Sequence, residues 1–303
     1  MPDEAEIRRR VEQELGQPTT SWVVPDTGWS AAIRHSVGLA DGTRVFVKAA
    51  TDDDTERWLR TEHLSLRHVP ERFAPRIITW LDGPGRPILI TDDLSRAHWP
   101  ASHQGVNWRP GDIDQVVAAV ADLSSVEAPE MFAPAVRAPV RWPDLLNGPD
   151  RPAFLELRLC SEKWLDDATP QLIAAESRCD EAGTSLVHGD IRSDNICIDG
   201  DRVVFVDWSH TSRGSADHDL ANLLPTLHLE GGALPYDVMP GGAPWAAAGA
   251  ATLAYRVLHD SLPDWLVPVM TRLIAIDLSW AASSLGLQPP AQPNNSGSSE
   301  SAV

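Results

Sequence analysis

The chain has 303 residues, 43% of them hydrophobic, which is enough to bury a full core and to form two lobes or domains. Its 25 basic and 43 acidic side chains give a net charge of −18, which argues against nucleic acid or an anionic membrane as the main partner. The three cysteines are too few and too widely spaced for a disulfide framework or a metal site. The acidic N-terminus does not resemble a signal peptide, and no apolar run approaches membrane-spanning length, so we expect a soluble, cytoplasmic protein.

The first part of the chain is predicted to form a five-stranded antiparallel sheet with one helix, after a short leading helix. Ile7, Val11 and Leu15 have helical spacing and indicate the leading helix over residues 4–15. An Asp-Gly pair at residues 41–42 predicts a hairpin turn. The strand-like runs, which are bounded by turn residues, are Thr20–Val24, Ala32–Leu39, Arg44–Ala49, Arg76–Leu81 and Pro87–Thr91.

A predicted helix over residues 54–69 carries a glutamate, Glu62, on its apolar stripe. A carboxylate that faces a core is costly unless it is paired. Lys48 ends the preceding strand and can supply the partner, and only two of the 25 basic residues are lysine. The pattern predicts a Lys48–Glu62 pair that leaves the ammonium to hold nucleotide phosphates. The alternative is a solvated Glu62 at the edge of the stripe and a routine charge at the strand end.

Two further segments are candidates for nucleotide binding. A loop at residues 26–30 could lie over the phosphates, with Ser30 and the backbone around Gly28 as donors, although it fits no phosphate-loop pattern and an ordinary turn is the alternative. Asp92 and Leu94 then leave the sheet, where a connecting strand can present backbone N–H and C=O groups to an adenine edge. The alternative for that segment is a plain linker.

After residue 94 the pattern becomes mainly helical, which predicts a lobe boundary there. We expect an N-terminal nucleotide-binding lobe over residues 1–94 and a catalytic and substrate lobe over residues 95–287. Residues 288–303 are rich in Pro, Gln, Asn and Ser and are expected to be a disordered tail. The predicted helices span residues 111–127, 153–166, 169–182, 217–229, 243–261 and 264–286.

Residue types that suit metal binding and proton transfer gather in the segment over residues 185–208. Two apolar runs, 196–198 and 203–206, flank an Asp-Gly turn and predict a hairpin. Asn195 enters its first strand and Asp207 leaves its second. Because paired strands lie about 4.7–4.9 Å apart, both oxygen ligands can reach one hard cation.

Asp190 lies on the loop just before this hairpin and is expected to lie next to the predicted cation site of Asn195 and Asp207. A carboxylate there can accept a proton from an attacking hydroxyl while a neighbouring metal neutralises phosphate charge, as phosphoryl transfer requires. The alternative is that Asp190 and Asn195 cap a turn and that Asp207 merely ends a strand. The hairpin fixes the geometry of all three residues, which favours the site.

These features resemble the aminoglycoside phosphotransferase family, the small-molecule branch of the protein-kinase-like fold, over most of residues 20–285. The family pattern of His-Gly-Asp, four residues and then Asn occurs from His188 to Asn195, and its metal-binding Asp after a short hairpin is Asp207. The resemblance implies an α+β fold with two lobes. The N-terminal lobe would hold the five-stranded antiparallel sheet and one helix, and the larger C-terminal lobe would be mainly helical.

The resemblance also implies the roles of individual residues. Asp190 would be the catalytic base, Asn195 and Asp207 would bind Mg²⁺, and Lys48, oriented by Glu62, would bind the nucleotide phosphates. The family's nucleotide loop corresponds to residues 28–30 and its hinge to residues 92–94, and these two matches are weaker.

Three neighbours of the catalytic segment are assigned differently. Asp219 and His188 are expected to brace and order the catalytic loop without reacting. Arg192 could stabilise charge that develops on the transferred phosphoryl group, or it could pair with Asp194 or another carboxylate in a purely structural ion pair.

The implied activity is Mg²⁺-dependent transfer of the γ-phosphate of ATP or GTP to a hydroxyl of a small molecule. An antibiotic, aminoglycoside-like or another hydroxylated natural product, is the first substrate class, and resistance or self-protection would follow. The alternatives are a housekeeping kinase of an amino alcohol, sugar or homoserine-like metabolite, and a catalytically silent nucleotide-binding scaffold. A protein kinase is disfavoured because only eleven residues separate Asp207 from Asp219, which leaves little room for a peptide-docking segment.

The charge of residues 215–287 bears on the substrate. Only two basic residues, Arg256 and Arg272, face seven acids in this range. If some of the acids line the pocket, a substrate that carries amines is favoured. If they form a solvated face and helix caps, the pocket suits an uncharged sugar or nucleoside. The seven acids are Asp217, Asp219, Glu230, Asp237, Asp260, Asp264 and Asp277.

Overall fold

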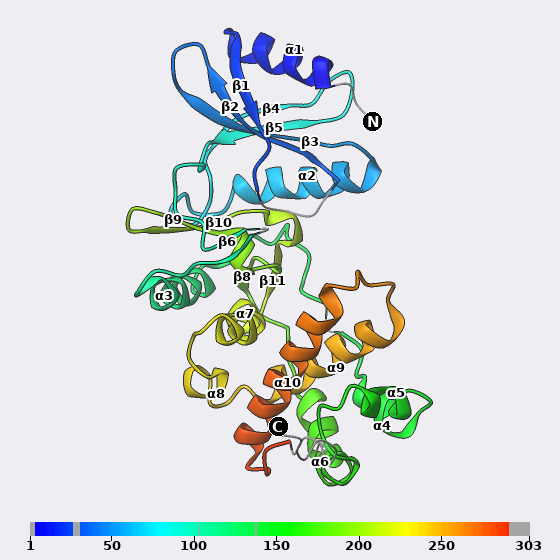
Figure 1. Cartoon of the computed structure of the whole chain (residues 1–303). Coiled ribbons are helices and arrows are strands. Elements are labelled where there is room, and N and C mark those ends of the chain that lie inside the picture. The colour runs from blue at the N-terminus through cyan, green and yellow to red at the C-terminus, as the bar shows by residue number, and fades with distance from the viewer. Residues whose placement is uncertain (1–3, 27–30, 103, 137, 291–303) are drawn as a thin grey trace, which may run out of the picture. The chain divides into compact units, whose positions relative to one another are not determined.

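The structure is a computed structural model that describes residues 4–26, 31–102, 104–136 and 138–290 (Figure 1). The chain divides into two compact units. Unit 1 comprises residues 1–135 and 183–220, and unit 2 comprises residues 136–182 and 221–303. This division does not test the lobe boundary expected near residue 94, which stays a prediction. The tail expected to be disordered lies mostly outside the described residues.

Unit 1 begins with the predicted five-stranded sheet, whose strand order is β1-β2-β3-β5-β4 and whose neighbours all pair antiparallel. The strand predictions are therefore confirmed, with ends that differ by a residue at most. The strands are β1 (Thr19–Val23), β2 (Ile33–Leu39), β3 (Arg44–Ala49), β4 (Ile77–Leu81) and β5 (Ile88–Asp92).

Alternation along β3 gives the sheet two different faces. Val45 and Val47 pack with Ile7 and Val11 of α1 (Glu4–Leu15) in one apolar cluster. Because successive side chains of a strand point to opposite faces, the residues between these valines point to the other face, where the pocket described below lies. The leading helix thus covers one face and leaves the second face to the site.

Helix α2 (Asp53–Leu66) follows β3 and is fixed at its start by a capping box. The N–H of Thr55 donates to Asp52 Oδ1 at 2.8 Å, and the N–H of Asp52 donates to Thr55 Oγ1 at 3.0 Å. Such reciprocal caps satisfy N–H groups that the first turn leaves without partners. Leu59 and Glu62 are both buried, so the glutamate lies on the core-facing stripe as predicted.

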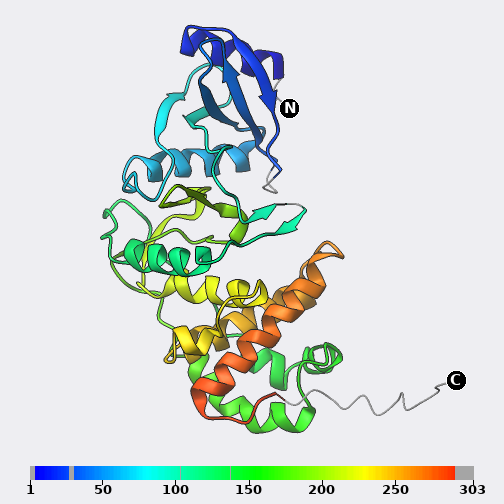
Figure 2. The ribbon, with the colours of Figure 1, turned by 60° about the vertical axis from the view of Figure 1, so that its left-hand side comes forward.

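The rest of unit 1 holds the predicted catalytic segment. The hairpin β9–β10 (Ile196–Asp199 and Arg202–Phe205) confirms the Asp-Gly turn prediction. A second small ladder pairs β8 (Ser185–Val187) with β11 (Ser212–Gly214). Helix α3 (Asp112–Ser124) lies beside β8 and β10 (Figure 2). The remaining short elements are β6 (Ala101–Ser102), β7 (Gly105–Val106), and the 3₁₀ turns η1 (Ser193–Asn195) and η2 (Trp208–His210).

Unit 2 is helical, and its centre is the pair α9 (Ala243–His259) and α10 (Leu266–Leu285), which lie side by side (Figure 2). The buried residues of α9 are all alanines, and these small side chains let α10 approach closely. The other helices are α4 (Trp142–Asn147), α5 (Arg151–Glu156), α6 (Glu162–Glu176), α8 (Pro235–Val238) and the part of α7 (His218–Leu229) after residue 220.

Two predictions in this region are wrong. The helices predicted over 153–166 and 169–182 are replaced by α5 and α6, because Arg158 adopts a left-handed backbone (φ 56°) that ends the first helix and Ser161 caps the second. The expected absence of any long apolar run was also too strict. By length and composition α10 could cross a membrane, although a single such helix is weak evidence for one, and its Met270, Ile274 and Leu278 are buried inside the protein.

Candidate active site

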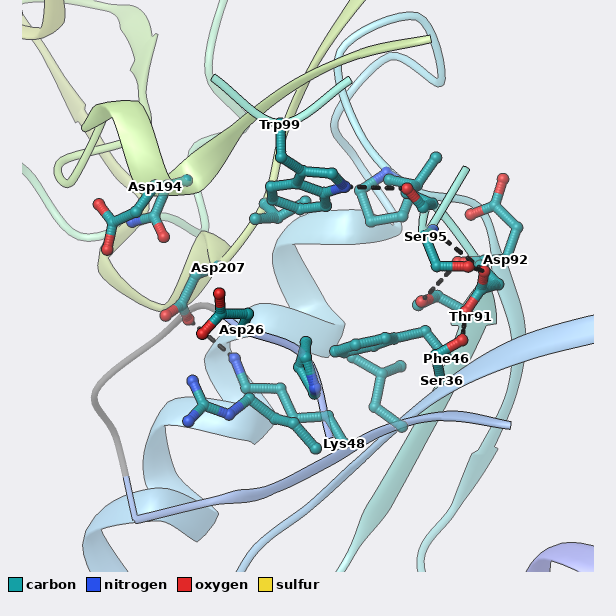
Figure 3. Close-up of a pocket in the computed structure, with 18 of the residues that line it drawn as sticks. Asp26, Ser36, Phe46, Lys48, Thr91, Asp92, Ser95, Trp99, Asp194 and Asp207 are labelled. Atoms are coloured by element: carbon teal, nitrogen blue, oxygen red, sulfur yellow. Dashed lines mark hydrogen bonds and ion pairs between the residues drawn. The ribbon is translucent and has the colours of Figure 1, made fainter. Parts of the chain in front are cut away.

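Lys48 is the centre of a buried charged cluster near the end of β3. Its Nζ lies 2.6 Å from Glu62 Oε2 and 2.8 Å from Asp207 Oδ1. The predicted Lys48–Glu62 pair is thus present, and Asp207 is a second partner (Figure 3). Burial opposes the charge of Lys48, but the two carboxylates outweigh it and raise the pKa of the ammonium. Burial also opposes the charge of Asp207, yet Lys48 holds the pKa of this carboxylate well below its usual range.

Asp207 adopts a left-handed backbone conformation, with φ 67° and ψ 58°. Such a conformation is uncommon for a residue with a side chain and costs of order 1–3 kcal/mol. It turns the chain sharply from β10 into η2, where the fully buried Trp208 anchors the turn. Ser209 Oγ donates to Asp207 Oδ1 at 3.1 Å. The turn therefore holds this carboxylate toward the pocket, next to Lys48 (Figure 3).

Asp219 holds the loop that carries Asp190 through two hydrogen bonds. Its two carboxylate oxygens accept the N–H groups of His188 at 2.7 Å and Gly189 at 2.9 Å. Gly189 has φ 81°, and a Cβ there would lie 2.6 Å from the carbonyl oxygen of His210. A larger residue would therefore displace the loop. Burial raises the pKa of Asp219 to about 6.

His188 orders the same loop through hydrogen bonds. Its Nδ1 accepts the N–H of Asp190 at 3.2 Å, and its Nε2 lies 3.1 Å from the carbonyl oxygen of Val206. Because a carbonyl only accepts, these partners assign the neutral tautomer with the proton on Nε2. Burial lowers the pKa of His188 to about 4, which agrees with a neutral ring.

Asn195 links the loop to the pocket. Its Nδ2 donates to the carbonyl oxygen of Asp190 at 2.9 Å and to Asp190 Oδ2 at 3.2 Å. Both contacts use the amide nitrogen, which leaves the amide oxygen available as a ligand or acceptor. Asn195 and Asp207 line one pocket, which confirms that the hairpin brings its two open ends together.

This pocket has a volume of about 280 Å³ and lies wholly within unit 1. At one end stand Lys48 and Asp207, and toward the other Phe46 and Trp99 approach from different sides (Figure 3). Glu62, which contacts Lys48, lines the same end. The apolar lining consists mainly of Phe46, Leu89, Leu94, Trp99 and Val206.

The predicted hinge residues Asp92 and Leu94 also line the pocket. Asp92 Oδ1 accepts the N–H of Arg76 at 2.7 Å, which fixes the end of β5. The carbonyl oxygen of Leu94 accepts from Trp99 Nε1 at 2.9 Å, so the indole is attached to the hinge itself. Gly28 and Ser30, predicted to lie over the phosphates, are outside the described residues, and the structure does not test them.

Comparison with known proteins decides the family. The sequence model of the phosphotransferase enzyme family matches residues 25–264, most of the chain. The chain belongs to this family. It is therefore an enzyme, a kinase that transfers a phosphoryl group to a hydroxyl. Among curated proteins, none matches the sequence.

Solved structures of such kinases share the fold. A choline/ethanolamine kinase family protein from Mesorhizobium loti aligns with a TM-score of 0.61 at 12% identity, covering 93% of this chain and 98% of that one. The macrolide 2'-phosphotransferase MphH from Brachybacterium faecium aligns with 0.50 at 17%, covering 94% and 91%. A streptomycin–ATP–APH(2'')-IIa complex aligns with 0.50 at 13%, covering 90% and 97%. These likenesses confirm the predicted α+β, protein-kinase-like fold.

Kinases of this kind generally use Mg²⁺, and the oxygen groups of the pocket fit such a cation. Mg²⁺ prefers oxygen ligands, keeps several waters, and takes one or two carboxylates plus phosphate oxygens in kinase sites. The Asp207 carboxylate and the amide oxygen of Asn195 supply the one carboxylate and the further oxygen that such a site requires from the protein. Among the described residues, no group of three or more His, Cys, Asp or Glu side chains could hold a metal. The protein therefore offers a site that a nucleotide would complete.

Arg192 makes the ion pair with Asp194 that one alternative predicted and contacts Asp190 as well, whereas its action on a transferred phosphoryl group stays a prediction. Its Nη2 lies 3.2 Å from Asp194 Oδ2, and its Nε lies 3.6 Å from Asp190 Oδ1. The guanidinium is about half exposed, so it bridges the two carboxylates at the surface of this phosphotransferase. Burial raises the pKa of Asp190, and Arg192 acts against that rise.

Sequence reasoning missed part of the pocket. Nothing in the local pattern around Trp99 indicated that its indole would reach back to the hinge. Arg34, on β2, was also overlooked, although its place in a strand opposite Lys48 is a usable signal. A buried polar group behind the hinge was missed as well: Ser36 Oγ donates to Asp93, and Arg44 contacts both.

Proposed function

We propose that this kinase transfers the γ-phosphate of ATP or GTP, with Mg²⁺, to a hydroxyl of a small hydroxylated molecule. The observation that carries the proposal is the convergence of Lys48, Asn195 and Asp207 on one pocket, with Asp190 hydrogen-bonded directly behind Asn195. A structural role for these groups would need no shared pocket. A catalytically silent scaffold would have no need of a base.

Asp190 is assigned as the base that accepts the proton of the substrate hydroxyl. Burial raises its pKa, which brings a carboxylate closer to the working range of a general base. The amide of Asn195 donates to Asp190 Oδ2, and the Arg192 Nε lies near Oδ1, so both oxygens are oriented. These contacts hold the carboxylate for proton transfer, and the charge of Arg192 opposes the rise in its pKa.

Lys48 binds and orients the phosphates, and Glu62 fixes its position. Asn195 Oδ1 and Asp207 would hold Mg²⁺, which when bound supplies neutralisation of phosphate charge. The Arg192 guanidinium lies close enough to Asp190 to act on charge at the transferred group, and this is the role we assign to it. Asp207 would then serve both the cation and Lys48, its observed partner at 2.8 Å.

The other end of the pocket suits a nucleobase. Phe46 and Trp99 offer aromatic faces to a flat ring, and the hinge offers backbone groups to its edge (Figure 3). The carbonyl of Leu94 already accepts from Trp99 and from the N–H of Ala97, whereas the carbonyl of Asp92 accepts one hydrogen bond, from Thr91 Oγ1. We therefore assign the Leu94 N–H and the Asp92 carbonyl to the base. The choice between ATP and GTP would be made by this edge.

For the acceptor we propose an antibiotic first, aminoglycoside-like or another hydroxylated natural product, with resistance or self-protection as the consequence. The solved structures that share the fold include a macrolide phosphotransferase and a streptomycin complex, but also a choline/ethanolamine kinase family protein, so a metabolite is the second class to test. The three cysteines are buried thiols that form no disulfide, which agrees with a reducing cytoplasm, the location we propose.

A cationic acceptor has less support than the sequence alone gave it. Of the seven acids after residue 215, Asp219 braces the catalytic loop, Asp277 is buried, and Asp260 pairs with Arg256 at 3.2 Å. These three are therefore not available to attract a substrate. The remaining four still allow one, and the dependence of KM on ionic strength decides between a cationic and a neutral acceptor.

The test is nucleotide consumption with Mg²⁺ and either ATP or GTP, screened over antibiotics and small hydroxylated metabolites. With the best acceptor, Asp190→Asn should lower kcat by about 10²–10⁴-fold and leave nucleotide affinity nearly unchanged. Asp201→Asn, the same change at an exposed position of the hairpin turn, is the matched control and should be silent. Undiminished kcat in Asp190→Asn would remove the base assignment, and nucleotide binding without any consumption across the panel would favour the scaffold.

A further inference from the structure

Arg34 lies directly across the sheet from Lys48. The two residues are register partners in the antiparallel ladder of β2 and β3. Side chains of such partners leave the same face of a sheet, with Cβ atoms about 4.5–5.5 Å apart. Both residues line the pocket, together with Glu62 and Asp207. The topology therefore places a second cation at the end of the pocket that holds the charged cluster.

The pocket has more acidic than basic lining residues, so a second cation matters for the binding of phosphate. Lys48 contacts two acidic side chains, Glu62 and Asp207, so one ammonium is shared between two acids before any phosphate binds. Among the described residues, the basic side chains that line the pocket are Lys48 and Arg34. Several phosphate charges would enter a pocket whose acidic lining residues are Asp26, Glu62, Asp92, Asp93, Asp194 and Asp207.

Arg34 stays charged although it is partly buried. Burial lowers the pKa of its guanidinium, whereas Asp207 and Glu62 act to raise it. A guanidinium stays protonated in proteins and presents a planar fork of donors that fits two phosphate oxygens at once. Lysine acts instead as a point charge. Arg34 thus offers a geometry that Lys48 lacks.

We propose that Arg34 is a second phosphate-binding residue of this kinase, which holds non-bridging oxygens of the nucleotide opposite Lys48. The inference rests on the proposed function, because it needs a nucleotide in this pocket. It predicts that the contribution of Arg34 grows with the number of phosphates on the ligand. A merely structural arginine would affect nucleoside and nucleotide equally.

The experiment is calorimetric titration, with Mg²⁺, of adenosine, AMP and ADP and of the guanosine series. In Arg34→Ala the affinity for the diphosphate should fall about 10- to 100-fold, as expected for charge-assisted hydrogen bonds, and the affinity for the nucleoside should change by less than about twofold. Arg34→Lys should recover part of the loss, since it keeps the charge but not the fork. Arg57→Ala, at an exposed position of α2, is the matched control and should leave the whole series unchanged.

The outcomes separate this inference from the proposed function. If the wild type binds neither ADP nor GDP, the proposed function fails and the inference fails with it. If the wild type binds a diphosphate and Arg34→Ala binds it equally well, only the role of Arg34 is refuted. An equal loss for nucleoside and diphosphate would also refute it, because that result marks a change of the pocket as a whole. A weaker dependence of diphosphate affinity on salt in Arg34→Ala than in the wild type is a second expected result.

Discussion

Both units bury charged side chains, but they use them in different ways. In unit 1, Lys48 joins Glu62 and Asp207, and the partners of the second pair lie 159 residues apart in sequence. In unit 2, Glu176 accepts the backbone N–H groups of Arg141 at 2.7 Å and Trp142 at 3.0 Å. Glu176 thereby caps the N-terminus of α4, whose N-cap residue makes no side-chain capping hydrogen bond.

Asp277 is the second buried carboxylate of unit 2. It lies on the buried face of α10, and its Oδ2 is 2.8 Å from the position that a Cβ on Gly249 would take. Burial alone raises its pKa well above the usual value. Burial of an acid is therefore no mark of a catalytic site by itself. What distinguishes unit 1 is that its acids meet a cation from a remote element inside a pocket.

The largest expected effect tests this distinction directly. Asp207→Ala should abolish Mg²⁺-dependent nucleotide binding, because the metal loses its anionic ligand and Lys48 loses a partner. Calorimetric titration with and without Mg²⁺ measures it. Glu176→Gln, a change to a buried acid of unit 2, should leave nucleotide affinity unchanged. Equal affinity in wild type and Asp207→Ala would mean that the cluster in unit 1 is as structural as the caps of unit 2.

The next effect concerns the coupling inside the cluster. Lys48→Ala should lower kcat/KM strongly, and Glu62→Gln should lower it less, because the second change keeps the ammonium but loosens its position. In the double variant the losses should be non-additive, with a coupling energy of about 0.5–3 kcal/mol, as found for residues in one network. Additive losses would show that the two side chains act independently despite the 2.6 Å that separates Nζ from Oε2.

The sequence predicted those parts of the site that depend on local pattern. The hairpin follows from two apolar runs around an Asp-Gly turn, and the pair of Lys48 and Glu62 follows from a carboxylate on an apolar stripe. In both cases the sheet and helix periods decide where a side chain points, so neighbours in sequence are enough. The approach of Asn195 and Asp207 follows from the hairpin alone.

Tertiary contacts account for what was missed. Asp207 as a partner of Lys48 required the hairpin to meet β3, and no pattern in either segment encodes that meeting. The indole of Trp99 is held at the hinge by its hydrogen bond to Leu94 and by packing against the buried Cys197 and Val204, which come from a distant part of the sequence. The break between α5 and α6 depends on the left-handed backbone of Arg158, a conformation that arginine rarely adopts and that composition does not reveal.

A smaller effect is expected from the pH dependence of His188. Its folded-state pKa of about 4 lies below the usual value of 6.5, so the unfolded chain binds the proton first as pH falls. The stability that the neutral ring contributes is complete above pH 6.5 and is lost as pH falls from there toward 4. The stability difference between wild type and His188→Gln should therefore shrink by about 2 kcal/mol between pH 7.5 and 5.

Denaturant unfolding of both proteins at a series of pH values measures this change. The comparison is needed because burial of Asp219 raises its pKa to about 6, which acts on stability with the opposite sign in the same range. Asp219 is present in both proteins, as are Asp207, His210 and Arg192, whose charges act on the ring. A difference that stays constant with pH would contradict a neutral His188 in the folded protein.

The smallest effect on nucleotide binding and turnover is expected at Asp277, the counterpart of the cluster in unit 2. Its folded-state pKa is raised, so the stability it contributes is complete below the unfolded pKa and is lost as pH rises. Asn resembles the protonated acid in shape. Asp277→Asn should therefore change stability by about 1 kcal/mol or less at pH 5, and its stability relative to wild type should increase toward pH 8.

Thermal or denaturant unfolding over this pH range tests Asp277→Asn, with Asp264→Asn, an exposed carboxylate of the same unit, as the control. Nucleotide affinity and turnover should stay at the wild-type level, because burial of this acid serves no pocket that we assign to the nucleotide. A loss of turnover with unchanged stability would place Asp277 with the acids that contact the acceptor. The contrast between the units would then be one of substrate, with nucleotide charge handled in unit 1 and acceptor charge in unit 2.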